Sequence, residues 1–180
     1  MDDMIYPLKN SIKNDYSQIF SNNSDINYKN IDNSFLDNLT QEKARSFIQK
    51  LEGYRESAYK DIAGVWTIGY GHTGNVKPGD KITKADAEKL FAKDFYKHTE
   101  PLKYVTIPLS NNEKIALTSF IYNMGPNAFK KSTLLKKLNE GNKKAAADEF
   151  DKWIYSKGEI SNGLINRRRL EKELFLKEDD

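Results

Sequence analysis

The sequence predicts an α+β fold in which a small antiparallel sheet lobe and a larger helical lobe are segregated along the chain. Residues 57–80, SAYKDIAGVWTIGYGHTGNVKPGD, are dense in glycine and aromatic residues. Within them Val65, Thr67 and Gly69 alternate with Trp66, Ile68 and Tyr70, as in a short strand between tight turns. The segments before and after carry apolar residues at the spacing of amphipathic helices, not the regular alternation of a parallel α/β fold.

The helix before the sheet is predicted over residues 40–52. Thr40 can cap its first backbone N–H groups, and Glu42 suits the positive end of the helix. A single apolar stripe is formed by Ala44, Phe47, Ile48 and Leu51. Gly53 is expected to end the helix in a left-handed conformation, which places Glu52 in its last turn.

Helical patterns continue from residue 83 to the end. Thr83 and Asp86 resemble a capping pair for a helix through residues 95 and 96, and this helix should join the two lobes. Ser110 and Glu113 form a capping box for a helix that runs to residue 124, where Gly125-Pro126 ends it. Further helices are expected near residues 132–140, 142–156 and 161–177, with Gly141 and Gly158 as ends. A cleft between two such lobes suits a polymer substrate.

Residues 1–39 differ from the rest of the chain, so we divide it into an N-terminal extension, 1–39, and a main domain, 40–180. The extension holds three lysines and six aspartates, a net charge of −3, against +3 for the whole chain. Apolar residues at three- and four-residue spacings predict a short amphipathic helix near residues 7–20, followed by a linker: Ile5, Leu8, Ile12, Tyr16 and Ile19. This helix either packs on the main domain or serves as a docking or delivery segment.

The composition excludes several kinds of site. The chain has no cysteine, which rules out disulfides, a thiol nucleophile and thiolate metal ligands. With only two histidines, neither a metal site nor a cofactor is expected. No apolar run approaches the roughly 18 residues of a membrane span, so we expect no stable membrane insertion. A mildly basic main domain suits an anionic polymer, although a nucleic acid has only this charge in its favour. We expect a monomer.

Glu52, Asp61 and Thr67 are the candidate catalytic residues. Glu52 ends a helix, where exposed carbonyl groups disfavour a carboxylate, and burial against Tyr54 or Trp66 would add to this effect. Both effects suit a general acid that works near neutral pH. Asp61 follows nine residues later and Thr67 six beyond that, so a folded-back sheet can present them opposite the helix end. Glycoside hydrolysis needs such an acid and a second carboxylate, and a hydroxyl can orient water. Spacing alone leaves open that the two acids are merely solvated.

The segment EGYRESAYKDIAGVWTIGYGHT, beginning at Glu52, resembles the phage-type lysozymes of glycoside hydrolase family 24. The likeness continues in ALTSFIYNMGPNAF from Ala116, STLLKKLNEG from Ser132 and GLINRRRLEKELF from Gly163. It covers about residues 40–177 and implies the lysozyme-like two-lobed fold. It also implies hydrolysis of the β-1,4 bond from N-acetylmuramic acid to N-acetylglucosamine, with Glu52 as the acid. Asp61 would then assist water or the developing oxocarbenium ion, and Thr67 would help to place that water. Such family members are treated as inverting, which requires carboxyl groups about 6.5–9.5 Å apart.

Other residues are assigned to substrate binding or to structural contacts. Tyr122 and Asn123 match the cleft-lining positions of the family and are the candidate substrate-binding residues, although Tyr122 also suits the core. We interpret His72 as a structural hydrogen-bonding or ion-pairing residue, and Glu56 as a solvated or cleft-edge acid. Three consecutive arginines either hold the anionic cell wall or pair with Glu171, Glu173 and helix-end carbonyl groups: Arg167, Arg168 and Arg169.

The expected partner is bacterial peptidoglycan, and the expected role is lysis of bacterial cells. We see no ordinary signal peptide in the first residues, MDDMIYPLKN. A protein made in the bacterial cytoplasm would then need a holin-type pore or a secretion apparatus to act at the cell wall or in the periplasm. Two alternatives remain open. One is a secreted antibacterial effector or bacteriocin with the same chemistry, and the other is a cell-wall-binding or membrane-acting module without hydrolysis.

Overall fold

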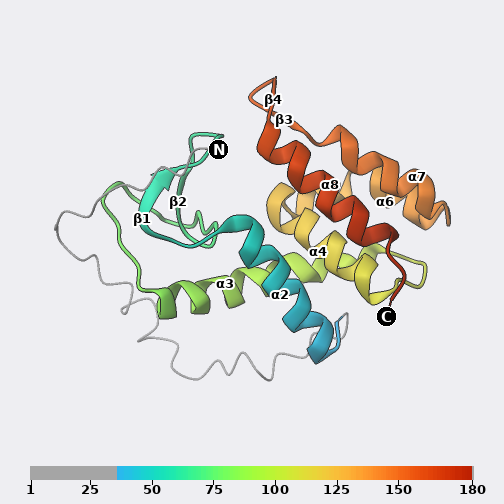
Figure 1. The fold of residues 1–180 in the computed structure, drawn as a ribbon, viewed down its shortest axis with the longest axis horizontal. Coiled ribbons are helices and arrows are strands. Elements are labelled where there is room, and N and C mark those ends of the chain that lie inside the picture. Colours follow the sequence, from blue (N-terminus) through green and yellow to red (C-terminus); the bar gives the residue numbers. More distant parts are fainter. Residues whose placement is uncertain (1–35, 180) are drawn as a thin grey trace.

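The computed structural model describes residues 36–179, and the helix expected near residues 7–20 lies outside this range. The described chain is α+β, as predicted (Figure 1). A first helix leads into an antiparallel pair of strands, a long helix follows, and a group of helices with one small hairpin completes the chain. In order these are α2 (Asn38–Glu52), β1 (Arg55–Lys60), β2 (Trp66–Gly69), α3 (Lys84–Thr99), a 3₁₀ helix (Glu100–Tyr104), α4 (Asn111–Met124), α5 (Pro126–Lys130), α6 (Thr133–Asn139), α7 (Lys143–Glu149), a 3₁₀ helix (Phe150–Lys152), β3 (Tyr155–Ser156), β4 (Glu159–Ile160) and α8 (Asn162–Leu176).

Helix α2 begins earlier than the sequence pattern indicated. Its N-cap is Asp37, whose Oδ1 accepts a hydrogen bond of 2.8 Å from the Thr40 backbone N–H. The prediction of Thr40 as the cap was therefore wrong, because the aspartate three residues upstream satisfies the same free backbone groups. Leu36, just before the cap, is buried in the core. The other end is as predicted: Glu52 is the last helical residue, and Gly53 follows with a φ of 68°.

The predicted sheet is confirmed, but burial does not alternate along β2. Strands β1 and β2 pair antiparallel, with Tyr59 opposite Thr67 and an irregularity between Arg55 and Tyr59. Thr67 and Ile68 are both buried, at 3% and 0% exposure. The reason is that α3 packs against β2, while Thr67 lies in the wall of the cleft described below.

Most predicted helix boundaries from residue 83 onward are confirmed. The capping pairs at Thr83 and Ser110 open α3 and α4, and the latter is a complete capping box with Glu113. The helix expected over residues 142–156 was wrong beyond its middle. It ends at Glu149 because the chain then makes a 3₁₀ turn and a β3–β4 hairpin that the pattern did not reveal. Gly158, with a φ of 83°, belongs to the turn of this hairpin and ends no helix.

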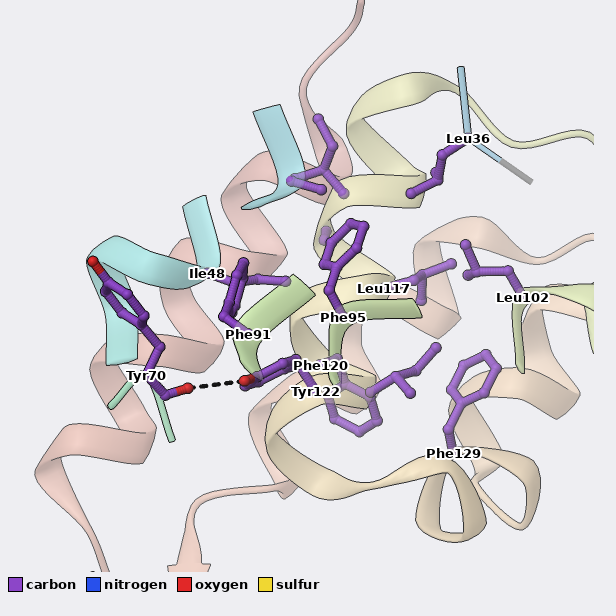
Figure 2. Packing of buried hydrophobic residues seen from close by; sticks show 14 of the residues in the cluster. Leu36, Ile48, Tyr70, Phe91, Phe95, Leu102, Leu117, Phe120, Tyr122 and Phe129 are labelled. Carbon is purple, nitrogen blue, oxygen red and sulfur yellow. Dashed lines mark hydrogen bonds between the residues drawn. The ribbon is translucent and has the colours of Figure 1, made fainter. Parts of the chain in front are cut away.

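Helix α4 forms the centre of the helical lobe. It contacts α2, α3, α5 and α8, and apolar residues on all its faces are buried. Figure 2 shows Phe120 and Tyr122 of this helix among aromatic and aliphatic side chains from several other elements. Phe120 is fully buried and makes edge-on contacts with Phe129, Phe150 and Trp153 at centroid distances of 5.3–6.5 Å. A helix enclosed in this way holds the surrounding elements in fixed positions.

Replacing Phe120 with alanine should lower the free energy of unfolding by about 3–5 kcal/mol, since the ring leaves a cavity that rigid neighbours fill only in part. Replacing the exposed Tyr155, which also loses an aromatic ring, should cost about 0.5 kcal/mol or less. Urea titration followed by circular dichroism measures both values. Equal losses in the two variants would show that α4 does not organise the core.

Candidate active site

A cavity of about 920 Å³ lies between the sheet and the helical lobe and brings together the three predicted catalytic residues. Glu52 reaches it from the end of α2, Asp61 from the residue after β1, and Thr67 from β2. Further walls come from α3, from the end of α4 and from the start of α8. A volume of this size accommodates several sugar rings of a polymer.

Glu52 is held between an arginine and a glycine. Its side chain is 16% exposed, and its Oε1 accepts a hydrogen bond of 2.6 Å from Arg167 Nη1. Gly71, with a φ of 84°, passes so close that a Cβ at this position would lie 3.0 Å from Glu52 Oε2. Glycine at residue 71 therefore serves both the backbone conformation and the space beside the carboxyl group.

Asp61 and Thr67 both make hydrogen bonds to Val65. The Val65 N–H donates to Asp61 Oδ1 at 2.8 Å, and the Thr67 hydroxyl donates to the Val65 carbonyl oxygen at 3.0 Å. Because its proton is used in this bond, the Thr67 oxygen has only acceptor capacity left for a group in the cleft. One turn thus sets the orientation of both side chains.

His72 makes structural contacts, as interpreted from the sequence. Its Nδ1 lies 2.6 Å from Asp94 Oδ2 of α3, and its Nε2 lies 3.0 Å from the Gly74 carbonyl oxygen. The contact with Asp94 joins the loop after β2 to the helix that connects the lobes. Glu56, by contrast, is exposed and is not among the residues that line the cleft.

The two predicted substrate-binding residues differ in their accessibility. Tyr122 lines the cleft but is 9% exposed, and its hydroxyl donates to the Tyr70 carbonyl oxygen at 2.8 Å (Figure 2). Burial raises its pKa well above the ordinary value, so it is uncharged near neutral pH. Asn123 is exposed in the cleft, and its Oδ1 accepts a hydrogen bond of 2.7 Å from Arg168 Nη2.

The arginine run divides into buried and exposed parts. Arg169 pairs with Glu173 on the surface, as predicted. Arg167 and Arg168 are 8% and 1% exposed and both pair with Glu171, which was also predicted. The contact from Arg167 to Glu52 was not predicted, because the two residues are 115 positions apart and no local pattern relates them.

Two other cleft residues were not predicted from the sequence. His98 of α3 lines the cleft, and its Nδ1 lies 2.5 Å from the Asp94 carbonyl oxygen. Burial lowers the pKa of His98, so the ring is neutral near pH 7. Tyr59 of β1 is a second example, and burial raises the pKa of its hydroxyl. His98 stands in no motif that would have singled it out, whereas Tyr59 lies in the segment that begins at Glu52 but was assigned no role.

Residues 36–179 contain no group of three or more His, Cys, Asp or Glu side chains arranged to hold a metal ion. Among the helices of this same range, none combines the length and apolar character needed to cross a membrane.

Known proteins match most of the chain. A family model described as phage lysozyme matches residues 49–171, which include Glu52, Asp61, Thr67 and Arg167. An endolysin of Acyrthosiphon pisum secondary endosymbiont phage 1 is 43% identical over 141 residues, 74% of this chain and 95% of the relative. The muramidase domain of SpmX from Asticaccaulis excentricus is 36% identical with a TM-score of 0.68, covering 76% of this chain and 96% of that one. An endolysin from Escherichia coli O157:H7 phage FAHEc1 is 38% identical with a TM-score of 0.67, covering 74% and 90%. This chain belongs to the phage lysozyme family and is an enzyme of the lysozyme type.

Proposed function

We propose that the chain is a muramidase that hydrolyses the β-1,4 bond between N-acetylmuramic acid and N-acetylglucosamine in peptidoglycan. The observation that carries the proposal is the convergence of Glu52, Asp61 and Thr67 on one cleft from three separate elements. The names of the relatives, endolysin and muramidase domain, agree with this substrate and with a role in lysis of the cell wall. Export through a holin-type pore or a secretion apparatus remains part of the proposal.

Glu52 acts as the general acid in this scheme. A guanidinium only donates hydrogen bonds, so Oε1, which accepts from Arg167, is not the oxygen that carries the proton. The proton of the neutral carboxyl group is therefore on Oε2, beside Gly71 of the cleft wall. From there it passes to the glycosidic oxygen as the bond to the anomeric carbon breaks.

Asp61 and Thr67 act on the water that replaces the leaving sugar. The water donates one hydrogen bond to the Thr67 oxygen and loses its other proton to the Asp61 carboxylate as it attacks the anomeric carbon. Attack from the face opposite the leaving group inverts the anomeric configuration. Exchange with solvent then returns a proton to Glu52 and removes one from Asp61.

Asn123 and Tyr122 hold the sugar chain in different ways. Because Asn123 Oδ1 is bound to Arg168, its side-chain NH₂ is the group that faces a carbonyl or hydroxyl oxygen of the substrate. The Tyr122 hydroxyl is bound to the Tyr70 carbonyl oxygen, which leaves the edge of its ring as the contact surface. We therefore assign orientation of the sugar to Asn123 and packing to Tyr122.

Replacing Glu52 with glutamine should reduce peptidoglycan hydrolysis by at least about 100-fold, because the shape is kept and the acidic proton is lost. Release of reducing ends from purified peptidoglycan measures this effect, with circular dichroism to verify the fold. Glu56→Gln is the matched control, since this glutamate is exposed and outside the cleft. A Glu52→Gln enzyme that keeps a tenth of its activity would refute the assignment, and killing without hydrolysis would favour the binding or membrane-acting alternative.

The first product formed by the wild-type enzyme should carry the new reducing end as the α-anomer, since a single displacement at a β-linkage inverts the anomeric carbon. Time-resolved proton NMR of a soluble glycan fragment, recorded before mutarotation, distinguishes the two anomers. An initial β-anomer would instead indicate a double displacement and overturn the assignment of Asp61 to water activation.

A further inference from the structure

The acid catalyst is one end of a buried chain of charges. Arg167 connects Glu52 to Glu171, since its Nη1 bonds to Glu52 at 2.6 Å and its Nε bonds to Glu171 Oε1 at 3.0 Å. Glu171 is completely buried and receives a second charge contact from Arg168 Nε, 3.1 Å from Oε2. Ser119 of α4 adds a hydrogen bond of 2.6 Å to Glu171 and accepts from Arg167 Nη2 through its carbonyl oxygen. We call Glu52, Arg167, Glu171 and Arg168 the charge chain.

The charge chain is balanced only while Glu52 is ionised. Two guanidinium groups and two carboxylates then sum to zero, whereas a protonated Glu52 leaves one net positive charge in a buried region. Burial alone would lower the pKa of Arg167, but the carboxylates of Glu52 and Glu171 outweigh it and the pKa is raised. Burial lowers the pKa of Arg168 to about 10, so this residue is also charged near neutral pH.

Without Glu171, no buried anion in contact with both arginines would oppose their positive potential at Glu52. Positive charges in a region of low dielectric constant stabilise a nearby carboxylate and weaken it as an acid. Glu171 contacts both guanidinium groups and so reduces their positive potential at Glu52. It also fixes the plane of Arg167 through Nε, which directs Nη1 to Glu52.

We propose that Glu171 is a positioning residue that directs Arg167 to Glu52 and, by its negative charge, offsets the positive potential of both arginines at the acid. The inference rests on the proposed role of Glu52 as the acid.

The remaining titratable groups around Glu52 do not supply this counter-charge. Electrostatic partners of Glu52 come from β1, α3 and α4 as well as α8: Tyr59, His98, Tyr122, Arg167 and Arg168. Burial keeps the two tyrosines and the histidine uncharged near pH 7, and Asp61, which lines the same cleft, is assigned to the water. Glu171 is thus the buried anion in contact with both arginines.

The test is the pH–activity profile of the full chain on purified peptidoglycan, recorded from about pH 4 to 9. In Glu171→Gln the basic limb should move to lower pH by about one unit, the scale of one unit charge acting at an effective dielectric constant of about 20. Activity above the limb then falls about tenfold, whereas the acidic plateau keeps most of its height. Glu173→Gln is the matched control on the same helix, because its pair with Arg169 is exposed, and its profile should not move.

Two further variants separate charge from structural damage. Arg168→Gln removes a positive charge and should move the basic limb to higher pH, opposite to Glu171→Gln. The double variant restores the balance and should return the limb to within about 0.3 unit of wild type. Shifts of opposite sign do not arise from simple misfolding, and these two variants decide the question if Glu171→Gln fails to fold.

One result would contradict the role of Glu171, and a different result would contradict the proposed function. A Glu171→Gln profile that superimposes on that of Glu173→Gln, or that drops equally at every pH, would overturn the inference while Glu52→Gln stays inactive. An active Glu52→Gln enzyme would instead overturn the proposed function itself.

Discussion

The 2.6 Å contact between Arg167 and Glu52 is the interaction on which the site depends, because it joins the end of α2 to α8. Helix α4 lies against both of these helices and holds them at a fixed separation. Removing Arg167 would leave the largely buried Glu52 carboxylate without the guanidinium it contacts, which is a costly change in a protein interior. The Glu52 carboxyl group is therefore positioned by the packing of the helical lobe, although it lines a cleft that the sheet lobe completes.

The sheet lobe is held against the helical lobe by short polar contacts. The Tyr122 hydroxyl bonds to the Tyr70 carbonyl oxygen, and Asp94 bonds to His72, so α4 and α3 each hold one point of the glycine-rich segment after β2. The turn at Val65 then orients Asp61 and Thr67. Glu52 thus belongs to the helical lobe, and Asp61 and Thr67 belong to the sheet lobe. The hydrogen bonds between the lobes help to set the distance from Glu52 to the other two residues.

Much of this architecture could be predicted from the sequence, because its signals are local. The capping box at Ser110 and the stop at Gly53 each depend on a few neighbouring residues, and both are confirmed. The catalytic residues were proposed from their order in the family motif, and the structure places all three in one cleft. The β3–β4 hairpin was missed because two-residue strands carry almost no periodicity. The Arg167–Glu52 contact was missed because it is set by helix packing over 115 residues, which no spacing rule encodes.

Helix α2 also keeps its N-terminal end, near Leu36, away from the cleft that its C-terminal end lines. Its first turn is anchored by Leu36 and Asp37, and its last residue, Glu52, lines the cleft. Fifteen residues at about 1.5 Å each place these ends roughly 20 Å apart. An additional module joined before Leu36 would therefore be attached far from the cleft. The domain could therefore gain or exchange such a module during evolution without changes in the residues of the cleft.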